Sequence, residues 1–293
     1  MGYQQGIVYF IDILGTKNIT NFDRKYEINS IFHNILEKNQ SNNLFLSHTV
    51  YERYISVFSD CSYIVYYYKD NTPESKKKIL DLFRTSLYNT SFVILEFLKH
   101  NFLCRGGVSI GEIYLEKNRN ILFGPALEQA YLLETKMAKY PRIIIEEKWA
   151  EKYLEMENNN YKKMKASKVS IDPFIFEKML EANGHIILKD SDNKYYLNYL
   201  NTIKQGIIYS EITDSKGFYE GLLEYSKKNT INYEEKFRKS SNNDEKREIS
   251  NILEKYEWFN NYLNISKPPD HHIPIILMPR EKIKISNNSG SDT

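Results

Sequence analysis

The sequence predicts an α+β fold in which strands and helices alternate in the order strand, helix, strand, strand, helix, strand. Runs of β-branched and aromatic residues, typical of strands, occur at 6–17, 55–68 and 102–111. Between them, residues 22–38 and 73–99 repeat apolar side chains at the spacing of an amphipathic helix. This order is that of the split βαβ, or ferredoxin-like, core.

The chain of 293 residues is long enough for one large domain or two small ones. From about residue 158 the composition shifts toward Asn, Lys and Tyr. We therefore expect a first domain at 1–156, a helical and hairpin extension at 157–285 packed on that core, and a disordered tail at 286–293.

Further elements are expected along the whole chain. We predict strands at 44–57 and 142–145, helices at 125–137, 212–238 and 244–263, and a hairpin over 185–200. The last helix is expected to dock on the first domain or on a second subunit.

Charge and hydropathy exclude several function classes. The chain has 40 basic and 38 acidic residues, so bulk charge implies no nucleic-acid partner. It has no apolar run long enough to cross a bilayer, and its N-terminus lacks a secretion signal. We expect a cytoplasmic protein, with Cys61 and Cys104 as buried free thiols.

The first strand carries the first candidate site. Its apolar run at 7–11 ends in Asp12, and Gly15 follows. A carboxylate beside an apolar run is costly to bury unless it is paired or binds a metal. Gly15 lets backbone N–H groups turn toward an anion, so the pair suggests a metal-bound phosphate. The alternative is a capping aspartate at a strand-to-helix turn.

A second aspartate favours the metal-site interpretation over the capping aspartate. Residues 55–68 are expected to fold into a hairpin about Ser59 and Asp60, with Asp60 at the tip. Two carboxylates at strand ends suit phosphoryl chemistry with two metal ions, and hard oxygen ligands favour Mg²⁺ or Mn²⁺.

Four ordered motifs within residues 5–150 give the chain a family resemblance. They are DILG at 12–15, FSD at 58–60, RGGVSIG at 105–111 and GPALEQAYLLE at 124–134. Together they resemble the class III nucleotidyl cyclases, and the pattern is most similar to the bacterial antiphage pyrimidine cyclases of the Pycsar type.

This resemblance implies a nucleotide cyclase, a phosphorus–oxygen lyase. It would convert UTP or CTP to the 3′,5′-cyclic monophosphate and pyrophosphate with two Mg²⁺ or Mn²⁺ ions, as a second messenger in antiphage defence. The enzyme is expected to be a homodimer with composite active sites. The implied catalytic residues are Asp12, Asp60 and Arg105, the metal site is Asp12, Ile13 and Asp60, and the substrate-binding residues are Gly15, Thr16, Lys17, Tyr54, Ser56 and Glu128.

The chain departs from the family pattern at several positions. Ser59 stands where a glycine is usual, and purine cyclases carry aspartate, asparagine and arginine where this chain has Pro125, Glu128 and Leu132. Either the base is a pyrimidine, or the chain is a catalytically silent module that binds a nucleotide or a partner protein. A polymerase-like two-metal enzyme is a third reading, which the lack of a long basic groove disfavours.

Single residues also keep alternative roles. Arg105 meets either a phosphate or an ion-pair partner. Lys17 contacts the terminal phosphates or is solvated. Tyr54 stacks on a pyrimidine or is an ordinary residue of the sheet.

Overall fold

The computed structural model describes residues 2–16, 19–45, 49–166, 183, 185–204, 207–208, 212, 214–268 and 275–276. Within these ranges, the first strands and helices are β1 (Gln4–Ile13), α1 (Phe22–Phe45), β2 (Tyr51–Phe58), β3 (Cys61–Tyr68), α2 (Ile79–Lys99) and β4 (Cys104–Glu116). They are followed by β5 (Ile121–Phe123), α3 (Pro125–Met137), β6 (Ile143–Ile145), α4 (Glu147–Ala166), β7 (Ile187–Lys189) and β8 (Tyr195–Leu197). The last are α6 (Asn201–Lys204), β9 (Ile207–Ile208), α7 (Ser215–Lys239), α8 (Asn243–Ile265) and β10 (Ile275–Ile276), and short 3₁₀ turns lie at Glu74–Lys76 and Lys117–Arg119.

The main sheet has the strand order β2-β3-β1-β4-β6-β8-β7, with β5 added to β4. The first four strands are antiparallel, with β1 between β3 and β4. This is the ferredoxin-like order, and it confirms the predicted α+β fold. The hairpin β7–β8, also predicted, extends the same sheet through β6.

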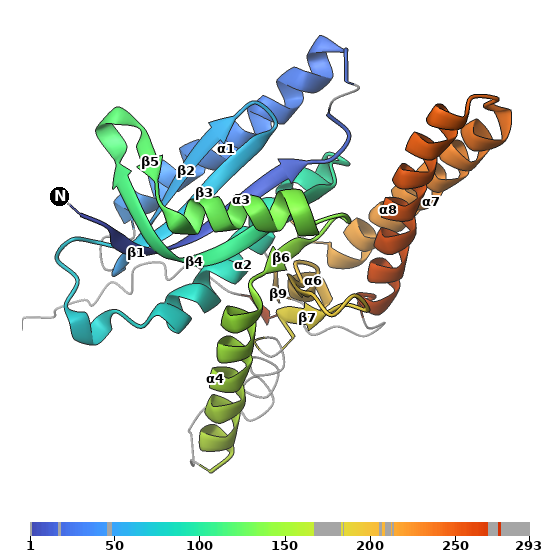
Figure 1. Cartoon of the computed structure of the whole chain (residues 1–293). Coiled ribbons are helices and arrows are strands. Elements are labelled where there is room, and N and C mark those ends of the chain that lie inside the picture. The colour runs from blue at the N-terminus through green and yellow to red at the C-terminus, as the bar shows by residue number, and fades with distance from the viewer. Residues whose placement is uncertain are drawn as a thin grey trace, which may run out of the picture.

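Alternation along β1 separates two cores. Ile7, Tyr9 and Ile11 point to one face, where α1 and α2 pack, and the Tyr9 hydroxyl bonds Ser86 of α2 at 2.8 Å. Val8 and Phe10 point to the other face, which α3 covers. Figure 1 shows α3 across this face of the sheet, and α7 and α8 side by side as a hairpin.

The glycine at position 107 lets α3 approach β4 closely. A Cβ built there would lie 2.4 Å from the carbonyl oxygen of Ala130 on α3. Such a contact is far shorter than van der Waals separation, so any side chain would push the helix away. The close packing of α3 on β4 therefore requires glycine at the second glycine position of the RGG motif.

Three predicted boundaries were wrong. Helix α1 continues to Phe45, beyond the predicted end at Lys38, because residues 39–45 contain neither Gly nor Pro and Asn only mildly disfavours a helix. The strand expected from Leu44 consequently begins at Tyr51.

The helix expected from Pro73 begins at Ile79 after a 3₁₀ turn, since consecutive lysines at 76–78 are unfavourable at the positive end of a helix dipole. Strand β5 and helix α4 were not predicted. Helix α4 is joined to α2 by the ion pair of Glu157 with Arg84.

Two further expectations concern the C-terminal tail and helices that could cross a bilayer. The predicted tail at 286–293 lies outside the described residues. Among the described helices, none combines the length and apolarity needed to cross a bilayer.

Candidate functional site

Asp12 and Asp60 lie at the same end of the sheet. Asp12 is on β1 opposite Cys61 of β3, and the backbone N–H of Ile13 donates to the carbonyl oxygen of Asp60 at 3.1 Å. The hairpin turn holds Ser59 at φ 56°, a left-handed conformation that explains why glycine is usual there. The β1–β3 register thus brings together the two carboxylates that the sequence singled out.

The turn after β1 closes over this end of the sheet. Gly15 has φ +85°, in the region that favours glycine. The hydroxyl of Thr16 donates to the Asp60 carboxylate and lies 3.4 Å from the carbonyl oxygen of Ile13. Thr16 is therefore a direct neighbour of the candidate metal ligand Asp60. Lys17 lies outside the described residues.

Arg105 on β4 bridges two carboxylates from different elements. Its Nε donates to Oδ2 of Asp12 at 3.0 Å, and its Nη2 lies 2.8 Å from Oε1 of Glu134 on α3. Of the two roles weighed for Arg105, the ion-pair role is present in this structure. Its Nη1 donates to the carbonyl oxygen of Ala138 at 3.4 Å, and the side chain, 29% exposed, also lines the cavity described below.

Glu134 is a site residue that the sequence reasoning missed. Its side chain is only 3% exposed, and burial and the nearby Asp12 charge raise its pKa despite the favourable Arg105. Burial, Asp60 and Asp12 likewise raise the pKa of the Cys61 thiol to about 11. Glu134 lies one helical turn after Ala130 on the buried face of α3. An acidic residue within this otherwise apolar stripe is the sequence feature that could have identified it as a site residue.

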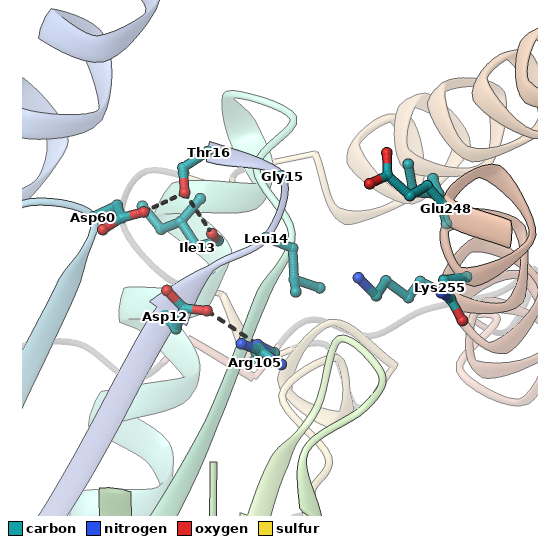
Figure 2. A pocket seen from close by; sticks show the side chains of 11 residues that line it. Asp12, Ile13, Leu14, Gly15, Thr16, Asp60, Arg105, Glu248 and Lys255 are labelled. Carbon is teal, nitrogen blue, oxygen red and sulfur yellow. Dashed lines mark hydrogen bonds and ion pairs between the residues drawn. The ribbon is translucent and has the colours of Figure 1, made fainter. Parts of the chain in front are cut away.

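Asp12, Asp60 and Arg105 line a cavity of about 430 Å³ whose opposite wall is formed by α8 (Figure 2). Its first wall is formed by residues 12–16 with Asp60 and Arg105. The second wall is a single stripe of α8 made of Glu248, Asn251, Ile252 and Lys255. The predicted helix over 244–263 thus docks on the core of its own chain. Its part in the site was not foreseen.

Three predicted substrate-binding residues lie outside this cavity. Tyr54 and Ser56 are on β2, and the strand register puts them on the same sheet face as Asp12. The Tyr54 hydroxyl donates to Oδ1 of Asn120 at 3.1 Å. Glu128 is exposed on α3. None of the three lines the cavity around Asp12 and Asp60.

The donor set suits a hard divalent cation. Asp12 and Asp60 offer carboxylate oxygens, and the adjacent Ile13 carbonyl offers a third oxygen. Mg²⁺ in phosphate-transfer sites is held by one or two carboxylates together with water and substrate phosphates. Among the described residues there is no group of three or more His, Cys, Asp or Glu side chains arranged for a metal.

No protein-family model matches the sequence, and no curated protein matches it. Among solved structures, the chain is similar to the catalytic core of a rhodopsin-guanylyl cyclase with converted specificity, in complex with ATPαS. The identity is 15% over 52% of this chain and 82% of that chain, with a TM-score of 0.37. It is also similar to the monomeric guanylyl cyclase domain of the RhoGC fusion protein from the aquatic fungus Blastocladiella emersonii, at 13% identity over 67% of this chain and 96% of that chain, with a TM-score of 0.39. The chemistry of the site is therefore inferred from this chain's own residues.

Proposed function

We propose that this protein is a nucleotidyl cyclase, which forms a 3′,5′-cyclic nucleotide and pyrophosphate from a nucleoside triphosphate. One observation carries the proposal. Asp12 and Asp60, 48 positions apart in the sequence, border one cavity together with Arg105. Two carboxylates in one cavity repel each other and are costly to desolvate, so their juxtaposition is best explained by cations that bind there.

The residues divide into a metal-binding group and a phosphate-binding group. Asp12, Asp60 and the Ile13 carbonyl would hold Mg²⁺ or Mn²⁺, two ions per site. When bound, such ions activate the ribose 3′-hydroxyl and stabilise the departing pyrophosphate. The Gly15 and Thr16 turn would face the phosphate chain with its backbone N–H groups, and Lys17 would add charge next to it. Arg105 keeps the Asp12 carboxylate oriented and meets a phosphate oxygen.

The proposed substrate is UTP or CTP. Purine cyclases carry an aspartate for adenine where this chain has Pro125, so a purine would lack that hydrogen-bond partner. They also carry an asparagine and a transition-state arginine where this chain has Glu128 and Leu132. Tyr54 can stack on a smaller base and offer its hydroxyl to an exocyclic group. A cyclic pyrimidine nucleotide made in this way would act as a second messenger in antiphage defence, which is the role of the family that the motifs resemble.

The active unit is proposed to be a twofold homodimer. Tyr54, Ser56 and Glu128 do not line the cavity that contains Asp12 and Asp60. In a twofold dimer they would complete the partner's site. Tyr131 and Leu132, neighbours on α3, are 47% and 37% exposed, which supports an interface on this side of the sheet.

A second candidate function is a silent cyclase-like module that binds a nucleotide or a partner protein. It is favoured by one observation: Arg105 already contacts both Asp12 and Glu134, so its charge is largely compensated before any phosphate arrives. In this case nucleotide binds without turnover.

Product analysis separates these functions. Purified protein is incubated with each of the four ribonucleoside triphosphates and Mn²⁺, and the products are separated by chromatography and identified by mass. A cyclase releases a 3′,5′-cyclic monophosphate and pyrophosphate in equal amounts from UTP or CTP. Release of a cyclic purine nucleotide would overturn the base assignment. Nucleotide binding without any product would favour the silent module.

A further inference from the structure

The cavity that contains the two aspartates has a second wall supplied by the C-terminal extension. Glu248, Asn251, Ile252 and Lys255 follow one another at spacings of three, one and three residues, which places them on one stripe of α8. Figure 2 shows the Lys255 side chain reaching from α8 toward the first wall of the cavity. The extension therefore contributes to the site itself.

The face of α8 next to this stripe is buried, which holds the stripe on the cavity. Tyr256 and Phe259 are buried, and the Tyr256 hydroxyl lies 3.2 Å from that of Tyr225 on α7. Ile252, in the middle of the stripe, is half-buried against the main core. Turning α8 about its axis would expose these apolar side chains to water. The orientation in which Lys255 faces the cavity is therefore favoured.

Contacts with the core also hold α8 along its length. Glu254 pairs with Lys139, which lies just after α3. The indole N–H of Trp258 donates to Oδ2 of Asp190 at 2.7 Å, and its ring stacks on Tyr140 with an interplanar angle of 3°. Lys255 thus lies between two anchored positions of the helix, which limits how far its backbone can move from the cavity.

The charges that line the cavity indicate that Lys255 would bind an anionic ligand. Acids dominate the cavity lining, with Asp12, Asp60 and Glu248 against the cations Arg105 and Lys255. Divalent ions on the two aspartates would reverse this balance and attract an anionic chain. An ammonium group offers three donors that adapt to phosphate oxygens, and Lys255 reaches from the wall opposite the Gly15 and Thr16 turn.

We propose that Lys255 of α8 is a substrate-binding residue that contacts the phosphate chain of a metal-bound triphosphate, so that the C-terminal extension completes the site in the same chain. This inference rests on the proposed function only for the identity of the triphosphate. It assigns to α8 a role in substrate affinity beyond packing.

Inorganic tripolyphosphate with Mn²⁺ tests this contact without a base and without turnover. Its binding to the full chain is measured by calorimetry at constant free Mn²⁺, for wild type, Lys255→Met, Lys255→Arg and Lys246→Met. Methionine keeps most of the apolar stem of lysine. Lys246 is a matched control because it lies nine residues earlier on α8, which places it on the opposite side of the helix.

We expect Lys255→Met to weaken tripolyphosphate binding about 10-fold to 100-fold, the scale of one charged hydrogen bond. Lys255→Arg should recover most of this loss, and Lys246→Met should bind as wild type. Equal melting temperatures for Lys255→Met and wild type confirm that the fold is intact. Unchanged binding in Lys255→Met, or no tripolyphosphate binding by wild type, overturns the inference.

The experiments distinguish failure of the proposed cyclase function from failure of the Lys255 inference. If no triphosphate is cyclised but the Lys255 effect on tripolyphosphate persists, the phosphate site stands and the cyclase proposal falls. If cyclisation occurs and Lys255→Met leaves both KM and tripolyphosphate affinity unchanged, the cyclase proposal stands and the role of α8 falls.

Discussion

The guanidinium of Arg105 donates from Nε to Oδ2 of Asp12 at 3.0 Å, and this bond places a cation beside one of the two carboxylates that face the cavity. Arg105 also contacts Glu134, so Asp12 is one of two acids that share it. Loss of Asp12 would therefore leave Arg105 with a partner. This relationship decides how the variants of the aspartates should behave.

We expect Asp12→Ala and Asp60→Ala each to abolish cyclisation while the fold persists. Each removes a metal ligand, and the change in unfolding free energy should be about 1 kcal/mol or less, since the groups are partly exposed and Arg105 keeps Glu134. Product assays and thermal melts measure the two parts. Asp70→Ala, at an exposed turn, is the control. Wild-type turnover in either variant would exclude the metal assignment.

Mixed dimers test whether the sites are composite. An Asp60→Ala chain mixed with a Glu128→Ala chain should recover about a quarter of wild-type activity, because half of the random dimers contain one intact site of two. The matched control is Asp60→Ala with Arg105→Ala. These two residues line the same cavity, so no mixed dimer has an intact site. A fully active monomer in sedimentation at assay concentration would contradict the prediction.

Base choice should depend on the ring of Tyr54. Tyr54→Ala is expected to weaken discrimination among the four triphosphates by about 1 to 3 kcal/mol, the scale of a lost stacking contact. Competition with equimolar triphosphates gives the product ratio directly. Asn120→Gly is the control, because it removes the hydrogen-bond partner of Tyr54 while glycine accepts the φ of 53° found at that position. An unchanged ratio in Tyr54→Ala removes this residue from the site.

The close approach of α3 to β4 predicts a difference between two glycines of one strand. Gly107→Ala should destabilise the fold by about 1 to 3 kcal/mol, because the new Cβ would lie 2.4 Å from the Ala130 carbonyl oxygen. Gly111→Ala should have little effect, since its Cβ would lie 3.5 Å from that of Ala126. Urea unfolding measures both variants. Equal stability of the two would show that α3 adjusts freely.

Acid should weaken the contact between Asp192 and the fully buried Arg142. Burial raises the pKa of Asp192, but hydrogen bonds from Arg142 and Lys194 outweigh it and lower that pKa well below its usual range. The stabilisation is therefore present above the unfolded pKa of about 3.9 and is lost as pH falls through the lower folded value.

Asp192→Asn should cost about 1 to 3 kcal/mol near neutral pH, because Arg142 then keeps only Asp190 as a carboxylate partner among the described residues. The difference from wild type should shrink below about pH 4. Urea unfolding across this range checks the sign. A difference that grows on acidification would contradict it.

Periodicity and turn chemistry were sufficient to predict the core. Each strand and helix of the βαββαβ unit carries its own local pattern, and the pairing of strands that follow such an order has few alternatives. The same reasoning put Asp12 and Asp60 at strand ends. It failed at the end of α1, where no Gly or Pro marks a boundary, and at α4, whose charged and amide residues dilute the apolar stripe.

Only the tertiary structure decided which residues share the cavity. Asp12 and Glu134 meet through Arg105 because β1, β4 and α3 pack together, and no local pattern encodes the partner of a charged side chain. Lys255 reaches the same cavity from a helix more than two hundred positions after Asp12. Its placement depends on how Trp258 and Ile252 dock on the core. Such long-range packing is set by the sum of many weak contacts, which a single sequence does not display.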